Sequence, residues 1–133
     1  MPVAISGAGR GYDVVADAPA YVLAGDESAL PALGQVLAAI PDSVPVSVHA
    51  EVTVPAARRT FPTRANATVT WPASMVDAVL GAPITPETRI WVAGEAAAVQ
   101  RIRRHLFEVR GIPRAHTTIR GYWKHGRAGT PDQ

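Results

Sequence analysis

The stretch Gly25-Asp26-Glu27-Ser28-Ala29-Leu30-Pro31-Ala32 follows the apolar run 21–24 and opens a segment of helical periodicity that reaches Ile40. An apolar strand, a glycine turn and a helix start together direct backbone N–H groups and the positive end of a helix toward one point. This arrangement favours a phosphate group, although similar junctions are also plain connections in many α/β domains. The stretch therefore indicates an α/β fold with a candidate nucleotide site.

Strand-like and helix-like segments alternate along the chain, which predicts βαβ units and a parallel sheet. The expected strands are 21–24, 44–54, 67–71, 89–93 and 116–122, and the expected helices are 30–40, 74–80 and 95–110. The last helix is expected to end at Gly111 and to bury Val99, Ile102, Leu106 and Val109. The predicted fold class is α/β, with a doubly wound five-stranded parallel sheet.

Composition excludes several classes of function. The 133 residues fit one domain, 47% of them are hydrophobic, and none is a cysteine, which rules out disulfides and thiolate metal sites. The four histidines lack metal-ligand spacing, so no metal site is expected. No apolar run approaches the roughly 20 residues of a membrane span. We therefore expect a cytoplasmic protein with no membrane partner. We also expect no nucleic-acid partner, because the arginines near the C-terminus are spread over a helix that needs a buried face.

The charges are distributed unevenly. Residues 1–98 carry five basic and nine acidic side chains, whereas residues 99–133 carry eight basic side chains and two acidic ones. Arginine accounts for nearly all of the basic residues and favours bidentate contacts with phosphate or carboxylate oxygens. The basic third of the chain fits an anionic ligand, and it equally fits a solvated helix face.

Three motifs carry a family resemblance: LAGDESALPA (23–32), WVAGEAAAVQRIRRHL (91–106) and GYWKHG (121–126). In this order and spacing they resemble the siderophore-interacting protein family, whose members are flavin-dependent ferric-siderophore reductases related to ferredoxin reductases. The resemblance covers roughly residues 6–127. Family members have an N-terminal flavin-binding barrel and a C-terminal nicotinamide-nucleotide domain, and this chain resembles only the second.

The resemblance implies that residues 1–133 form a single nucleotide-binding domain without a flavin barrel. It implies the strand order 3-2-1-4-5 and a ferredoxin reductase-like fold. The implied cofactor is NADP(H) or NAD(H), with FAD available only in trans from a separate flavin-binding protein.

Pattern and resemblance together place the Gly25–Ser28 and Gly94–Glu95 segments on opposite walls of one cleft. Gly25 and the backbone N–H groups through Ser28 are expected to serve the pyrophosphate, while Asp26 and Glu27 fit helix caps. Ala93, Gly94 and Glu95 are expected beside the nicotinamide, and Glu95 also fits a helix start.

The ribose end of the nucleotide is expected beyond the second strand. Glu51 suits ribose hydroxyls, which favours the unphosphorylated cofactor. Arg58 and Arg59 suit a 2′-phosphate, and they also fit an exposed loop.

The C-terminal motif supplies the expected substrate contacts. Tyr122 and Trp123 suit stacking on a flavin or nicotinamide ring, and they also fit a protein core. Lys124 and Arg127 beside them suit an anionic ferric siderophore, as the resemblance implies.

Two functions remain open at this point. The first is the NAD(P)H-binding half of a ferric-siderophore reductase, which supplies hydride to a flavin held by a separate chain and is expected to have no catalytic residue of its own. The second is a stand-alone nucleotide- or siderophore-binding module without redox activity.

Overall fold

The computed structural model describes residue 14, residues 17–58, residue 61 and residues 66–123. A five-stranded sheet in the order β3-β2-β1-β4-β5 forms its centre, and all neighbouring strands run parallel. The strands are β1 (Tyr21–Asp26), β2 (Val46–Glu51), β3 (Ala67–Thr70), β4 (Arg89–Glu95) and β5 (Thr117–Trp123). The predicted fold class and strand order are confirmed.

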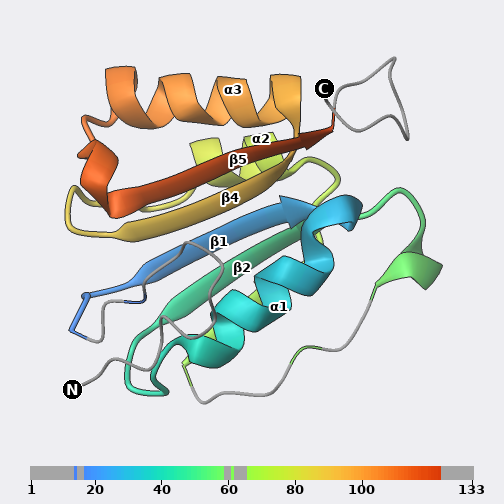
Figure 1. The fold of residues 1–133 in the computed structure, drawn as a ribbon, viewed down its shortest axis with the longest axis horizontal. Coiled ribbons are helices and arrows are strands. Elements are labelled where there is room, and N and C mark those ends of the chain that lie inside the picture. The colour runs from blue at the N-terminus through green and yellow to red at the C-terminus, as the bar shows by residue number, and fades with distance from the viewer. Residues whose placement is uncertain (1–13, 15–16, 59–60, 62–65, 124–133) are drawn as a thin grey trace.

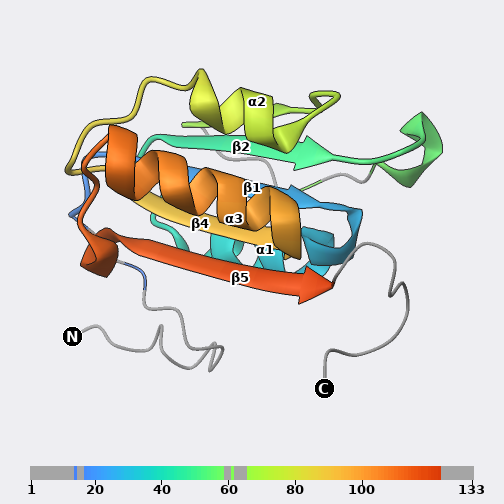
Figure 2. The same ribbon diagram turned by 90° about the horizontal axis from the view of Figure 1, so that it is seen from above.

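Helices cover both faces of this sheet, as Figures 1 and 2 show. Helix α1 (Leu30–Ala39) lies on one face, whereas α2 (Met75–Leu80) and α3 (Ala96–Arg104) lie on the other. A 3₁₀ turn at Glu27–Ala29 precedes α1, and a π-helical turn at His105–Val109 continues α3. The layers bring the starts of all three helices to the carboxyl edge of the sheet.

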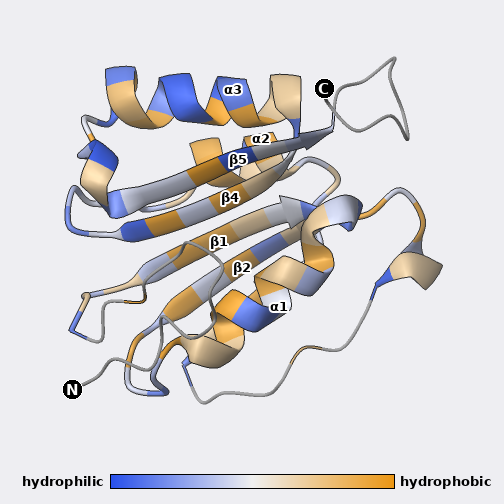
Figure 3. Ribbon diagram, viewed as in Figure 1, coloured by the Kyte–Doolittle hydropathy of each residue, from blue (hydrophilic) through white to orange (hydrophobic). Residues whose placement is uncertain are grey.

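The central strands are apolar because they are buried on both faces. Alternate residues of β1 serve two hydrophobic cores, with Leu23 packed among the residues of α1, and Val22 and Ala24 packed among those of α2 and α3. Figure 3 shows hydrophobic colour on the central strands, whereas much of α3 has hydrophilic colour. The sheet is therefore a rigid base for residues at the strand ends.

Strands β1 and β4 both run two residues further than the sequence pattern predicts, so Gly25 and Gly94 lie inside strands rather than in turns. A Cβ atom on Gly25 would lie 3.1 Å from Ala29 Cβ and 3.3 Å from Leu33 Cδ1. Gly25 thus allows the start of α1 to pack closely on the sheet.

The prediction that Val109 faces the core is wrong, because its side chain is 71% exposed. The π-helical turn has more residues per turn than an α-helix, so residues after Leu106 rotate away from the predicted face. Arg110 turns inward instead. Its guanidinium donates hydrogen bonds of 2.8–3.4 Å to three carbonyl oxygens at and just beyond the end of α2, those of Leu80, Ala82 and Ile84.

We expect Arg110→Met to lower the free energy of unfolding by about 1–3 kcal/mol, because it removes the donors from partly buried carbonyl groups. Urea denaturation measures this change. Arg104→Met, on the exposed face of α3, is the matched control and should change stability by less than about 0.5 kcal/mol. Equal unfolding midpoints for the two variants would contradict the anchoring role of Arg110.

His49 should make stability depend on pH. Burial lowers the pKa of its imidazole, whose Nδ1 lies 2.9 Å from Thr70 Oγ1. The unfolded chain therefore takes up a proton more readily, and stability should fall as the pH drops below about 6.5. Thermal unfolding between about pH 7.5 and pH 5.5 should show a smaller decline for His49→Asn than for the wild type. Identical pH profiles would exclude this contribution.

Candidate functional site

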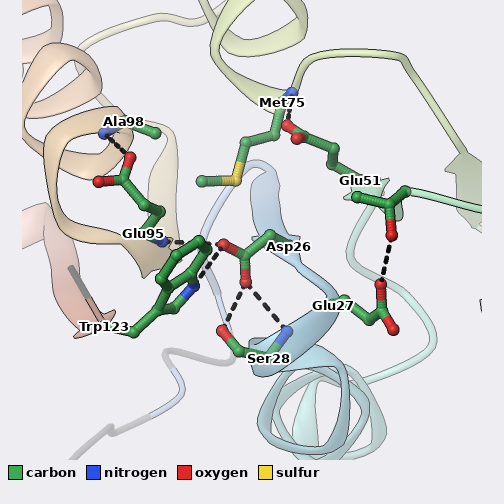
Figure 4. A pocket seen from close by; sticks show the side chains of 9 residues that line it. Asp26, Glu27, Ser28, Glu51, Met75, Glu95, Ala98 and Trp123 are labelled. Carbon is green, nitrogen blue, oxygen red and sulfur yellow. Dashed lines mark hydrogen bonds between the residues drawn. The ribbon is translucent and has the colours of Figure 1, made fainter. Parts of the chain in front are cut away.

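A cleft of about 680 Å³ opens at the carboxyl edge of the sheet, where the strand order reverses between β1 and β4. Parallel α/β sheets bind their ligands at this place. The volume lies within the range of about 300–1,000 Å³ that is usual for small-molecule sites. Figure 4 shows its lining, which consists of Asp26, Glu27, Ser28, Glu51, Thr53, Met75, Glu95, Ala98 and Trp123.

The Asp26 side chain accepts four hydrogen bonds at this cleft. Its Oδ1 accepts hydrogen bonds from the backbone N–H of Ser28 at 3.0 Å and from the Ser28 hydroxyl at 2.6 Å. Its Oδ2 accepts from the Glu95 N–H at 2.8 Å and from the indole Nε1–H of Trp123 at 3.1 Å. The predicted capping role of Asp26 is confirmed, since it is the N-cap of the turn that leads into α1.

Gly94 allows Asp26 to approach β4 this closely. A Cβ atom at this position would lie only 2.7 Å from Asp26 Oδ2, and the φ angle of +155° lies in a region that favours glycine. Gly94 therefore makes room for the carboxylate rather than lining the cleft itself.

The other carboxylates also bond to nearby donors. Glu95 is the N-cap of α3 and accepts from the N–H groups of Ala97 and Ala98, both at 2.9 Å. Glu51 accepts from the Met75 N–H at the start of α2 at 2.8 Å. Carboxylates of the chain itself therefore accept hydrogen bonds from backbone N–H groups at the starts of the helices around the cleft.

This arrangement determines which chemical groups fit the cleft. Four carboxylates line it, and none of its described lining residues is basic. A pyrophosphate would meet negative charge, whereas ribose hydroxyls and a carboxamide N–H₂ would find acceptors. Met75 and Trp123 add apolar surface for a flat ring. The described lining thus fits the nicotinamide and ribose parts of a dinucleotide better than its phosphates.

The structure brings together five of the site residues that lie in the three family motifs. Asp26, Glu27, Ser28, Glu95 and Trp123 all line the cleft. The remaining three residues of the two glycine segments, Gly25, Ala93 and Gly94, are buried behind this surface.

The other proposed contacts lie elsewhere. Arg58 is exposed, with its guanidinium carbon 5.7 Å from the centre of the Trp71 ring, and it is not part of the cleft lining. Tyr122 is 40% exposed and also lies outside the lining. Arg59, Lys124 and Arg127 fall outside the described residues.

Three lining residues were not identified from the sequence: Thr53, Met75 and Ala98. Each follows a strand end or begins a helix, and this position is the signal that could have found them, because helix starts meet strand ends at the same edge. Glu51, considered above for the ribose, does line the cleft.

The described part of the chain contains no group of three or more His, Cys, Asp or Glu residues arranged to hold a metal ion. Within the same residues, no helix is long and apolar enough to cross a membrane.

Comparisons with known proteins place the chain in a family and identify proteins of similar fold. A mycobactin import ATP-binding/permease protein, IrtA, from Mycolicibacterium smegmatis is 29% identical over 125 residues, which cover 89% of this chain but 14% of that protein. A siderophore utilization protein from T. fusca has a similar structure, with a TM-score of 0.74 and 30% identity over 84% of this chain and 47% of that one.

A reductase also has a similar fold. The Amycolatopsis cytochrome P450 reductase GcoB matches 81% of this chain and 38% of its own, with a TM-score of 0.58 and 19% identity, so this likeness concerns the fold alone. The chain thus spans only a part of the length of each of these relatives. Residues 18–126 match the siderophore-interacting protein family, and the chain belongs to that family.

Proposed function

We propose that the cleft binds NAD(P)H and that the domain presents its nicotinamide to a flavin held by a separate polypeptide, for the reduction of a ferric siderophore. The observation that carries this proposal is the cleft itself. It lies at the reversal of strand order in a reductase-like fold, and it combines an indole wall with acceptors suited to a ribose and a carboxamide.

Residues of the chain bind and orient the nucleotide in this proposal. Glu51 keeps one carboxylate oxygen on the Met75 N–H and presents the other to ribose hydroxyls. Glu27, which accepts from the Thr53 hydroxyl at 3.2 Å, is a second acceptor on the same side. Bound NAD(P)H would supply a hydride, and the protein contributes position and electrostatics.

The siderophore enters the proposal through the family and through the name of the M. smegmatis relative, which concerns mycobactin import. Lys124 and Arg127 follow Trp123 in the sequence, and an anionic ferric complex would be attracted to them. NADP(H) and NAD(H) both remain candidates, because Arg58 stacks on Trp71 rather than lining the cleft.

Calorimetric titration tests nucleotide binding directly. We expect NADPH or NADH to bind with a Kd between about 1 μM and 1 mM, the usual range for enzyme substrates. Glu51→Gln should weaken binding about fivefold to tenfold, since it replaces a charged acceptor and keeps one oxygen for the Met75 N–H. Glu87→Gln, outside the cleft, is the control. Absence of binding by both nucleotides would sink the proposal and favour a module that holds another ligand.

The requirement for a flavin gives a second test. NAD(P)H donates two electrons as hydride, whereas each ferric ion accepts one, so reduction should need a flavin between them. Under anaerobic conditions, the chain mixed with NADPH and a ferric siderophore should release no ferrous iron to a chelating dye. Addition of a flavin-loaded barrel domain from a family member should start the release. Rapid release without any flavin would refute this division of tasks.

A further inference from the structure

The pairing of β4 and β5 changes register at the rim of the cleft. Gly94 lies opposite Gly121, but the next residue, Glu95, lies opposite Trp123. Tyr122 is passed over and becomes the extra residue of a β-bulge, a feature that redirects side chains beside functional sites. Without this bulge, Tyr122 would occupy the position opposite Glu95. The bulge thus brings an indole, rather than a phenol, to the cleft.

Asp26 contacts this indole from β1. Its Oδ2 atom holds both the Trp123 Nε1–H at 3.1 Å and the Glu95 N–H at 2.8 Å. We call these two hydrogen bonds the latch. They join the carboxyl ends of β1, β4 and β5 through one oxygen atom, while Oδ1 is used separately for the two Ser28 contacts. Figure 4 shows both sets of bonds.

We propose that Asp26 is a positioning residue that fixes the indole of Trp123 as a preformed aromatic wall of the cleft. The hydrogen bond of the indole N–H holds the ring at a position where it lines the cleft, so a flat ligand ring in the cleft would meet it. A wall that is ordered before the ligand arrives removes the entropy cost of ordering it upon binding. The proposal rests on the nucleotide-binding function for the identity of that ring, which is the nicotinamide.

Asp26→Asn separates the latch from the helix cap. Asparagine is as good an N-cap as aspartate, so its carbonyl oxygen can keep the Ser28 N–H. Its amide N–H₂ then faces the donors of Glu95 and Trp123, and the latch is lost. Trp123→Phe breaks the same bond from the other side and keeps an aromatic ring. Asp77→Asn, on α2 and outside the cleft lining, is the control for the loss of one negative charge.

The first measurement needs no ligand. The three tryptophan indole N–H groups give separate signals in ¹H–¹⁵N spectra of the labelled chain, and their hydrogen exchange with solvent can be followed one by one. In Asp26→Asn we expect exchange at Trp123 to become about tenfold faster, a loss of local protection, while Trp71 and Trp91 stay unchanged. Asp77→Asn should leave all three unchanged. An unaltered rate at Trp123 in Asp26→Asn would overturn the proposal.

The second measurement is NADPH affinity in a double-mutant cycle. Asp26→Asn should weaken binding about fivefold to tenfold in the wild-type background and by less than about twofold in the Trp123→Phe background, because both changes remove one interaction. Equal losses in the two backgrounds would mean that Asp26 acts without Trp123 and would overturn the proposal. If the wild type binds no nucleotide, the proposed function fails by itself, and the exchange rates still decide whether Asp26 holds the indole.

Discussion

The carboxylate of Asp26 is the interaction on which the arrangement of the cleft depends. One side chain accepts four hydrogen bonds, from a helix start, from the end of β4 and from the last residue of β5. Hydrogen bonds to a charged acceptor are stronger than those between neutral groups, so this carboxylate firmly joins the end of β1 to the paired ends of β4 and β5. Gly94 belongs to the same arrangement, because any side chain there would meet the carboxylate.

Self-capping by carboxylates explains why the site differs from a phosphate-binding loop on a similar scaffold. In a phosphate site the N–H groups at the helix start face the ligand. In this chain Asp26 and Glu95 take those donors at the starts of two helices, and Glu51 takes the donor at the start of the third. The local charge therefore favours ligand groups that donate hydrogen bonds, whichever molecule carries them.

The fold was predictable because its signals are local and repeated. Runs rich in apolar and β-branched residues, bounded by glycine or proline, marked the strands, and the family resemblance supplied their order. The capping role of Asp26 also followed from its place before a helix. The position of Val109 did not, because a π-helical turn leaves no simple pattern in the sequence and changes which side of the helix faces the core.

The site was only partly predictable, because several of its residues are brought together by the pairing of distant strands. Asp26 and Glu95 stand out because glycine precedes each of them, but Met75 and Thr53 reach the cleft only through the sheet order and the length of β2. The latch depends on a bulge that shifts Trp123 by one position against β4. The periodicity of one segment predicts neither the pairing register of distant strands nor a bulge between them.

The π-helical turn after α3 has a consequence for how the chain tolerates changes in length. A π turn is equivalent to one residue inserted into a regular helix. Deletion of a single residue between His105 and Val109 would therefore restore α-helical geometry and leave the later residues in place, because the wide turn had absorbed the extra residue. If all five residues formed a regular α-helix instead, each later residue would rotate by about 100° around the axis. Arg110 would then leave the carbonyl groups of Leu80 and Ala82, although no atom of its own had been altered. The docking of α2 against α3 thus depends on the wide turn as well as on the identity of Arg110.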